Sequence, residues 1–281
     1  GVIPYMKVAI EEEDSLSEKL EQSQKGLIDL AVIRLPRMSN YTDFDVFEQN
    51  PDVSVRYVTG VAELSDPDLI LLPGSKNTMG DLKWMRENGL EAAIKKKAAT
   101  TVIFGICGGY QMLGECIEDP YGVEEGGKMR GMELLPTRTV LKKEKIRTQE
   151  EVVLPEISGV LSGLSGKKAR GYEIHMGETM AVDAIKPLCH LDQKNDVVCQ
   201  ERDGGQRDNV YGTYVHGIFD DKDVAYDLCR LLAEKKGLTL QAEADTDYQS
   251  FKESQYDLLA EGIRKSMDMD AVYAMLQDAA I

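Results

Sequence analysis

The sequence lacks several features that would mark a membrane, extracellular or nucleic-acid-binding protein. No apolar stretch approaches the roughly 20 residues of a membrane span, and the start, GVIPYMKVAIEEED, resembles neither a signal peptide nor a transit peptide. The five cysteines are odd in number and contain no CxxC pair, which argues against a disulfide framework or a zinc knuckle. Basic residues number 33 against 49 acidic ones, and a formal charge of -16 would repel nucleic acid. We expect a soluble, cytoplasmic protein that binds neither nucleic acid nor a membrane.

The chain is long enough for one large α/β domain with appendages. It has 281 residues, and the polar, acidic stretch EEEDSLSEKLEQSQK near its start is typical of a connector. We therefore predict an interdomain connector over residues 1–25, a main domain over 26–236 and a helical C-terminal tail over 237–281. The sequence begins with Gly1 and not with Met, which indicates a piece of a longer protein.

Strand-like and helix-like segments alternate through the first part of the main domain. Short, β-branched runs bounded by Pro, Gly, Asn or Asp lie at residues 28–36, 53–58, 68–73 and 100–106. Helical spacing separates them, at residues 41–50 and 78–98. This alternation predicts an α/β fold with a doubly wound, mostly parallel sheet. Strand-like segments punctuated by glycine, from about 121 to 215, predict an antiparallel extension, and C-terminal helices are expected from residue 221 onward.

One cysteine stands where a parallel sheet places its ligands. In TTVIFGICGGYQMLG, Cys107 follows a predicted strand and precedes a predicted helix, with Gly105, Gly108 and Gly109 around it. This G-x-C-x-G spacing is that of a nucleophile elbow, in which small neighbours allow a sharp turn. The start of the helix favours a thiolate, and the Gly108 N–H can face a developing oxyanion. The other four cysteines lack such surroundings and are interpreted as buried, inert thiols.

A nucleophilic thiolate also needs a second oxyanion donor and an imidazole. The stretch LILLPGSKNT supplies another strand end, where the Gly74 and Ser75 amides could point into the same crevice. Only three histidines are present. His216, in VYGTYVHGIFD, stands at a strand terminus and is favoured over His175, in RGYEIHMGET, which stays a rival; His190 is interpreted as a surface loop residue.

Four motifs together resemble a known family. GICGGYQ, PGSKNT, GYEIHMGET and YGTYVHGIFD are similar to class I, triad-type glutamine amidotransferases, and within them to the C-terminal amidotransferase domain of cobyric acid synthases, over about residues 27–232. The resemblance implies a flavodoxin-like doubly wound fold. It also implies that Cys107 attacks the side-chain amide of glutamine, that His216 protonates the departing ammonia, and that water hydrolyses the thioester. Gln111 matches the position that helps to hold glutamine.

The resemblance also implies partners outside this chain. In the family the ammonia passes to an N-terminal ATP-dependent synthetase domain, which amidates carboxylates of a corrinoid acceptor, adenosylcobyrinic acid a,c-diamide. We therefore expect no cofactor or metal in this chain, and ATP and Mg in the missing synthetase domain. The stretch GVEEGGKM matches G-x-x-x-x-G-K, but Met129 replaces Ser or Thr, and Glu124 and Glu125 would repel phosphate. It is interpreted as a turn.

One departure from the family pattern affects the expected mechanism. Typical class I members carry an acid two positions after the histidine, where this chain has Ile218. The cobyric acid synthase branch lacks this acid, so a Cys-His dyad is expected, with Asp220, Glu173 or Glu178 as candidate substitutes. Three alternatives stay open. They are a sibling amidotransferase (cobyrinic acid a,c-diamide synthase or a cell-wall amidating complex), a cysteine hydrolase of related fold, and a non-catalytic partner-binding module.

Overall fold

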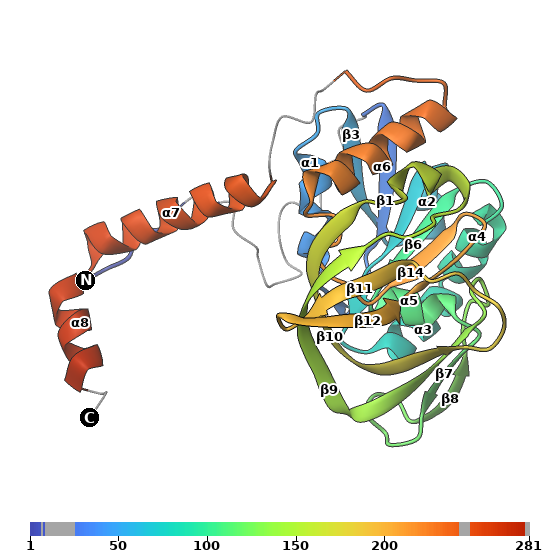
Figure 1. Ribbon diagram of the computed structural model, residues 1–281, viewed down its shortest axis with the longest axis horizontal. Coiled ribbons are helices and arrows are strands. Elements are labelled where there is room, and N and C mark those ends of the chain that lie inside the picture. The colour runs from blue at the N-terminus through green and yellow to red at the C-terminus, as the bar shows by residue number, and fades with distance from the viewer. Residues whose placement is uncertain (7, 9–25, 242–247, 279–281) are drawn as a thin grey trace.

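The computed structural model of the protein describes residues 1–6, 8, 26–241 and 248–278 (Figure 1). Most of the connector predicted for residues 1–25 lies outside the described residues. The described part consists of two large sheets and one two-stranded sheet with helices packed around them, followed by two helices that extend away from the sheets.

Six strands form the main sheet, in the order β13-β14-β6-β4-β1-β3. They are β1 (Ile28–Ile33), β3 (Val53–Val58), β4 (Leu69–Leu72), β6 (Val102–Ile106), β13 (Gly205–Arg207) and β14 (Val210–Thr213). Neighbouring strands pair in parallel except for β13, which is antiparallel to β14. Strands β4 and β6 are buried along their whole length, as expected of parallel strands covered on both faces. The predicted doubly wound, mostly parallel sheet is confirmed.

The helices of the main domain lie between strands, except for α6, which follows the last strand, β14. They are η2 (Tyr41–Phe44), α1 (Asp45–Glu48), α2 (Val61–Leu64), α3 (Thr78–Glu87), α4 (Leu90–Lys97), α5 (Gly108–Leu113), η3 (Gly159–Leu164) and α6 (Lys222–Lys235). The helical pattern predicted over residues 78–98 divides in two because Gly89 adopts φ 84°, which an α-helix cannot accommodate. Helix α6 has the predicted signals: the Asp221 side chain accepts a bond from Asp223 N, and Val224, Leu228 and Leu232 are buried on one face.

Most of the strand-like segments of residues 121–215 form a second sheet and do not extend the main sheet. Its strands run β12-β11-β9-β7-β8, with β10 also paired to β9. They are β7 (Cys116–Asp119), β8 (Gly127–Arg130), β9 (Thr137–Val153), β10 (Lys168–Ala181), β11 (Cys189–Lys194) and β12 (Val197–Asp203). Of these segments, β13 and β14 join the main sheet, where β14 is parallel to β6 and β13 is antiparallel to β14. Buried and less buried residues alternate along much of β9, which is typical of a sheet with one solvated face.

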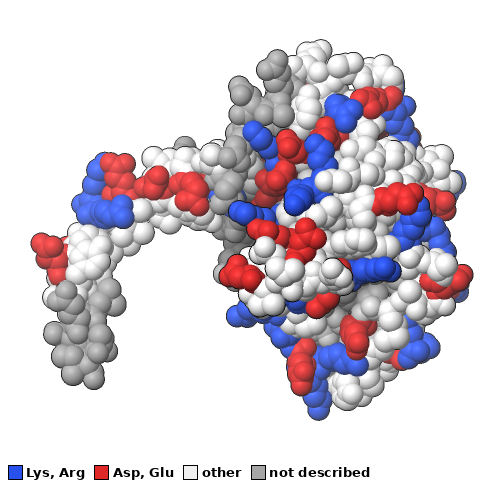
Figure 2. Space-filling view, in the orientation of Figure 1, with Lys and Arg blue, Asp and Glu red and all other residues white. Residues whose placement is uncertain are grey.

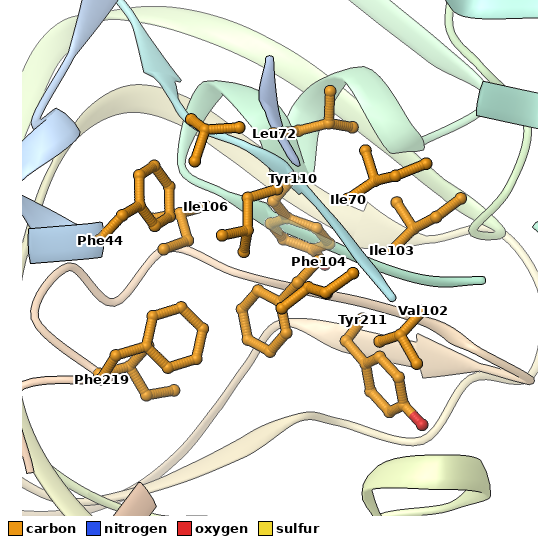
Figure 3. Packing of buried hydrophobic residues seen from close by; sticks show 14 of the residues in the cluster. Phe44, Ile70, Leu72, Val102, Ile103, Phe104, Ile106, Tyr110, Tyr211 and Phe219 are labelled. Carbon is orange, nitrogen blue, oxygen red and sulfur yellow. The ribbon is translucent and has the colours of Figure 1, made fainter. Parts of the chain in front are cut away.

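Aromatic side chains fill the core beside the main sheet (Figure 3). Phe104 of β6 meets Phe219 edge to face at 4.9 Å between ring centroids, and Phe219 also packs against Phe47 at 5.1 Å. These contacts join α1 and the segment after β14 to the centre of the sheet. They hold in place the two loops on which the site described below depends.

The C-terminal helices α7 (Tyr248–Ser266) and α8 (Met269–Asp278) extend away from the two sheets (Figure 1). Lys252 forms an ion pair with Asp220 at 3.0 Å, which ties the start of α7 to the main domain. Acidic and basic side chains are interspersed over the visible face of the molecule (Figure 2). No helix in the described part of the chain is both long and apolar enough to span a bilayer.

Strand β6, helix α5 and strand β4 pack so closely that Gly105 and Gly109 leave no room for a side chain. A Cβ on Gly109 would lie 2.0 Å from the Leu72 carbonyl oxygen, and one on Gly105 would lie 2.7 Å from the Gly109 carbonyl carbon. We expect Gly109→Ala to lower the free energy of unfolding by about 1–3 kcal/mol, because backbone has to move to make room. Urea denaturation measures the change. Gly60→Ala is the control, since nothing lies within 4 Å of the added atom; equal losses in the two variants would contradict the packing argument.

Candidate active site

Cys107 occupies the sharp turn between β6 and α5. Its φ of 52° and ψ of -110° lie outside the regions that residues with a Cβ normally adopt. Two backbone bonds hold the turn, from Cys107 N to Thr213 O at 2.8 Å and from Gln111 N to Cys107 O at 3.0 Å. Strain of this kind persists where surrounding structure over-determines it, and it is typical of a nucleophile elbow. The predicted strand-turn-helix context of Cys107 is present.

A cavity of about 700 Å³ opens beside the sulfur. Cys107 is largely buried but lines this cavity, and its Sγ lies 3.8 Å from the Ile174 carbonyl oxygen. The wall combines residues from the segments that follow strands of the main sheet with Tyr172, Ile174 and His175 of the second sheet. The volume is in the usual range of a small-molecule pocket. The thiol is therefore accessible to a small molecule.

His216 is held by a buried aspartate that the sequence analysis did not identify. Its Nδ1 lies 2.7 Å from Asp43 Oδ2, and the other Asp43 oxygen accepts the Gly217 amide at 2.9 Å. Both side chains are almost fully buried. With Nδ1–H donated to the carboxylate, the ring presents Nε2 to the Cys107 side. The structure thus assembles a thiol, an imidazole and a carboxylate where a dyad was expected.

Asp43 makes the His216 ring strongly basic. Burial opposes the charged form, but the Asp43 carboxylate outweighs it and, together with the Cys107 sulfur, raises the pKa of His216 to about 10. His216 Nε2 is buried and has no hydrogen-bond partner among the described residues. The Cys107 sulfur is nevertheless near enough to raise the pKa of the His216 ring.

Tyr172 also contacts His216, through both its backbone and its ring. The Tyr172 and His216 backbones exchange two hydrogen bonds, at 2.8 and 3.1 Å, and their rings stack with centroids 5.2 Å apart. Asn40 Nδ2 donates to the Tyr172 hydroxyl at 2.7 Å. A Cβ on Gly171 would lie 2.2 Å from the His216 carbonyl oxygen, so this close approach requires glycine. The second sheet therefore helps to orient the imidazole.

The other two histidines occupy different environments. His175 is buried, stacks on Tyr214 at 3.7 Å, and has partners for both ring nitrogens: Gly177 O at 2.7 Å and Glu173 Oε2 at 3.5 Å. It lines the cavity, but neither nitrogen is left for a thiol. His190 was expected in a surface loop; it lies instead in strand β11 and is partly buried.

None of the three expected substitutes for the missing acid contacts His216. Asp220 pairs with Lys252 at 3.0 Å, Glu178 with Lys142 at 3.0 Å, and Glu173 lies beside His175. None of these three candidates therefore takes the place of the missing acid; Asp43 does. The carboxylate comes from the short helix after β1, 173 residues earlier in the chain. The available signal was that YTDF lies in the connection that leaves the carboxyl end of the β1 strand, at the same edge of the sheet as Cys107.

The predicted oxyanion donors lie beside the elbow. Gly108 opens helix α5, so its N–H has no partner within the helix. A Cβ on Gly108 would lie only 2.9 Å from Ser75 N, which shows how closely the two backbones approach. Strand β5 (Gly74–Ser75) pairs with β2 (Met38–Ser39), and the Ser75 hydroxyl donates to Asp81 Oδ2 at 2.7 Å. Gly74 lies next to the imidazole, since a Cβ there would be 3.4 Å from His216 Cε1.

Gln111 is buried in the cavity wall. Its Oε1 accepts from the Thr78 hydroxyl at 3.0 Å and its Nε2 donates to the Tyr214 hydroxyl at 3.1 Å. Gly177 approaches so closely that a Cβ would lie 2.2 Å from Gln111 Nε2. The side chain therefore has a fixed position at the cavity, and its role in holding a ligand stays a prediction.

The segment GVEEGGKM forms a loop that leads into β8, as interpreted from the sequence. Asp119 organises it by accepting the amides of Val123, Glu124 and Gly126 at 2.7–2.9 Å. The Glu124 carboxylate accepts Met79 N at 2.8 Å, at the start of α3. Among the described residues, no group of three or more His, Cys, Asp or Glu side chains is arranged to hold a metal ion.

The basicity of His216 can be tested directly. We expect NMR titration to give His216 a pKa near 10, and we expect Asp43→Asn to lower it to about the ordinary value of 6.5 or below, because burial then acts without the carboxylate. Since the folded pKa exceeds the unfolded one, the stabilisation is complete below pH 6.5 and is lost as the pH rises toward 10. The difference in the free energy of unfolding between the wild type and Asp43→Asn should therefore decrease as the pH rises from 6.5 toward 10. An unchanged His216 titration in the variant would contradict the pairing.

Comparison with known proteins agrees with this geometry. Residues 29–224 match the CobB/CobQ-like glutamine amidotransferase domain. A cobyric acid synthase of Ruminiclostridium cellulolyticum is 50% identical over 99% of this chain and 55% of its own length, and one of Lachnoclostridium phytofermentans is 48% identical over 99% and 56%. This chain thus spans about half the length of these curated relatives. The structure of PurLQS from Thermotoga maritima shares the fold, with a TM-score of 0.54 and 20% identity over 74% of this chain and 96% of that one. The chain belongs to the CobB/CobQ-like glutamine amidotransferase domain family.

Proposed function

We propose that this chain hydrolyses the side-chain amide of glutamine through a thioester on Cys107, and that the ammonia serves the amidation reaction of a cobyric acid synthase. The observation that carries the proposal is the grouping of the Cys107 thiol, which lines the cavity, with the buried pair of the His216 imidazole and the Asp43 carboxylate. Family membership and the names of the relatives support the choice of glutamine and of this pathway.

The reaction follows from the positions of the groups. The Cys107 thiolate attacks the amide carbon, and the oxyanion accepts hydrogen bonds from the Gly108 and Ser75 amides. His216 Nε2–H gives its proton to the nitrogen as the C–N bond breaks, which releases ammonia. The neutral ring then takes a proton from water, which attacks the thioester and releases glutamate and the thiolate. Asp43 keeps the ring in one tautomer and stabilises each imidazolium stage.

The acceptor chemistry is assigned to the part of the relatives that this chain does not span. An N-terminal synthetase domain would bind ATP and Mg and activate carboxylates of the corrinoid acceptor, adenosylcobyrinic acid a,c-diamide. Two features of this chain support the division. The 122–129 segment is a loop and a strand and not a strand-to-helix phosphate loop, and its Glu124 carboxylate already accepts Met79 N at the start of α3.

The nucleophile is tested by covalent labelling. A chloroketone analogue of glutamine should label one thiol in the wild-type protein, and Cys107→Ala should abolish both labelling and glutamate release, since no other thiol lines the elbow. Mass spectrometry of peptides locates the label. Cys116→Ala is the matched control, because that thiol is buried in β7 away from the cavity. Labelling of Cys116 or Cys199 in place of Cys107 would defeat the assignment.

The base and its partner are tested by kinetics. His216→Asn should lower kcat by about three orders of magnitude or more, and Asp43→Asn by about two to four, because the second leaves an imidazole without its fixed tautomer. Glutamate release at pH 7.5 measures both. His175→Asn is the control, and its effect should be smaller because that ring has partners at both nitrogens. Loss of thioester turnover in His175→Asn alone would reverse the choice of base.

A further inference from the structure

A cluster of charged side chains lies buried in the second sheet, apart from the groups that the hydrolytic steps use. Glu150 of β9 pairs with Lys194 of β11 on one side and with Gly171 of β10 on the other. Glu173 stands two residues beyond Gly171 in the same strand. Directly paired residues, and residues two apart in a strand, project from the same face of a sheet. Glu150, Glu173 and Lys194 therefore share one face across three neighbouring strands.

This face packs against the segment that carries His216. A Cβ on Gly171 would project from the face and would lie 2.2 Å from the His216 carbonyl oxygen and 2.5 Å from Val215 Cγ1. The side chains of Glu150 and Glu173 are 0% and 6% exposed. An ionised carboxylate at such a depth is costly unless a charge or hydrogen-bond donors compensate it.

One ammonium group serves both buried carboxyl groups. Lys194 Nζ lies 3.7 Å from Glu150 Oε1 and 3.7 Å from Glu173 Oε2. It also pairs at 3.1 Å with Glu201, whose side chain is more than half exposed. His175 Nε2 lies 3.5 Å from Glu173 Oε2. Two carboxylates that share one site repel each other, which disfavours the ionisation of both.

The neighbouring titratable groups do not correct this imbalance. Asp203 of β12 is a third buried carboxylate whose charge acts on Glu150, although it accepts two hydrogen bonds at the end of β14. Burial raises the pKa of the Cys189 thiol, so this group stays neutral. Even with the His175 ring charged, two cations would face three buried carboxylates.

Glu150 has an oxygen that lacks a donor. Its Oε1 accepts the Thr148 hydroxyl at 3.0 Å, whereas Oε2 is buried and has no hydrogen-bond partner among the described residues. A proton on this carboxyl group makes it a donor, and the Glu173 carboxylate is within its hydrogen-bonding reach. Burial, and next the charge of Glu173, raise the pKa of Glu150 to about 8. At Glu173 burial acts in the same direction, but His175, Lys194 and Glu150 outweigh it and lower the pKa.

Glu173 lies between the two residues of β10 that contact the catalytic groups. Tyr172 exchanges backbone hydrogen bonds with His216 at 2.8 and 3.1 Å, and the Ile174 carbonyl oxygen lies 3.8 Å from Cys107 Sγ. Because the three residues are consecutive, a displacement of Glu173 also moves Tyr172 and Ile174. The anchoring of Glu173 in the cluster therefore affects the alignment of the imidazole and the thiol.

We propose that Glu150 holds a proton and donates it to Glu173, and that this carboxyl–carboxylate hydrogen bond keeps strand β10 where the imidazole and the thiol require it. Glu150 and Glu173 are positioning residues and take no part in bond breaking. When Glu150 loses its proton to water at high pH, two buried carboxylates repel each other between β9 and β10, and the alignment is lost. The effect on activity rests on the proposed glutaminase function.

Amide and alanine variants test the shared proton. Glutamine in place of Glu150 keeps a donor toward Glu173 at every pH, whereas alanine removes it. We expect Glu150→Ala to lower kcat for glutamine by about ten- to hundredfold, with KM changed by no more than about threefold, because the reacting groups lose their alignment. Glu150→Gln should restore most of this loss. Glu173→Gln should lower kcat as Glu150→Ala does, since it removes the charged acceptor.

The pH profile of kcat separates positioning from a merely structural role. The wild-type kcat should fall as the pH rises through about 8, and this fall should be absent in Glu150→Gln. Glu151→Gln is the matched control, because this adjacent carboxylate is 42% exposed and pairs with Arg170. Its kcat and its profile should match the wild type. A Glu150→Gln variant that is as slow as Glu150→Ala, or that keeps the alkaline fall, would overturn the proposal.

Urea denaturation detects the proton without turnover. The pKa of Glu150 in the folded protein exceeds the ordinary value of 4.5, so unfolding releases its proton between pH 4.5 and about 8. The free energy of unfolding of the wild type should therefore fall relative to that of Glu150→Gln as the pH rises over this interval. The same pH dependence in both proteins would contradict the protonation of Glu150.

Infrared difference spectroscopy observes the protonated carboxyl group directly. At pH 7 the wild type should show a carboxylic acid C=O band that Glu150→Gln removes and Glu151→Gln retains. A spectrum in which Glu150→Gln removes no such band would overturn the proposal. Failure of the proposed function is a different result, since the wild-type protein would then release no glutamate at any pH while the band and the stability difference persist.

Discussion

The hydrogen bond between His216 and Asp43 is the interaction on which the site depends. Both groups are almost fully buried, and a buried carboxylate is costly unless its oxygens are satisfied. Asp43 meets this requirement with two donors, the His216 ring and the Gly217 amide. The pair links the loop after β1 to the segment after β14, and removal of either partner would leave the other charge buried without compensation.

The order of the main sheet explains why four distant segments meet. Strands β14, β6, β4 and β1 are neighbours and run in parallel, so their carboxyl ends lie along one edge. Asp43 follows β1, the Gly74–Ser75 turn follows β4, Cys107 follows β6, and His216 follows β14. Ligands of open α/β sheets bind at this edge. Each strand end contributes one chemical function, and the short connections leave little freedom in where it points.

This geometry also shows what could be predicted from the sequence. Strands of β-branched residues and the glycines around Cys107 are local signals, so the sheet class and the elbow followed from them. The partner of His216 did not, because the expected position holds Ile218 and Asp43 looked like part of an amphipathic helix beside Phe44 and Phe47. A contact across 173 residues leaves no local pattern. The second sheet was predicted as an extension for the same reason, since strand-like segments do not indicate which strands pair.

The two large sheets supply different parts of the site. The main sheet supplies the thiol, the imidazole, the carboxylate and the backbone donors, all at rigid strand ends. The second sheet supplies the cavity wall through β10 and the bulged part of β9, and Tyr172 joins the two sheets by pairing with His216. Bulges and loops tolerate sequence change better than buried parallel strands do. Ligand selection can therefore vary in the second sheet while the reacting groups in the first keep their positions.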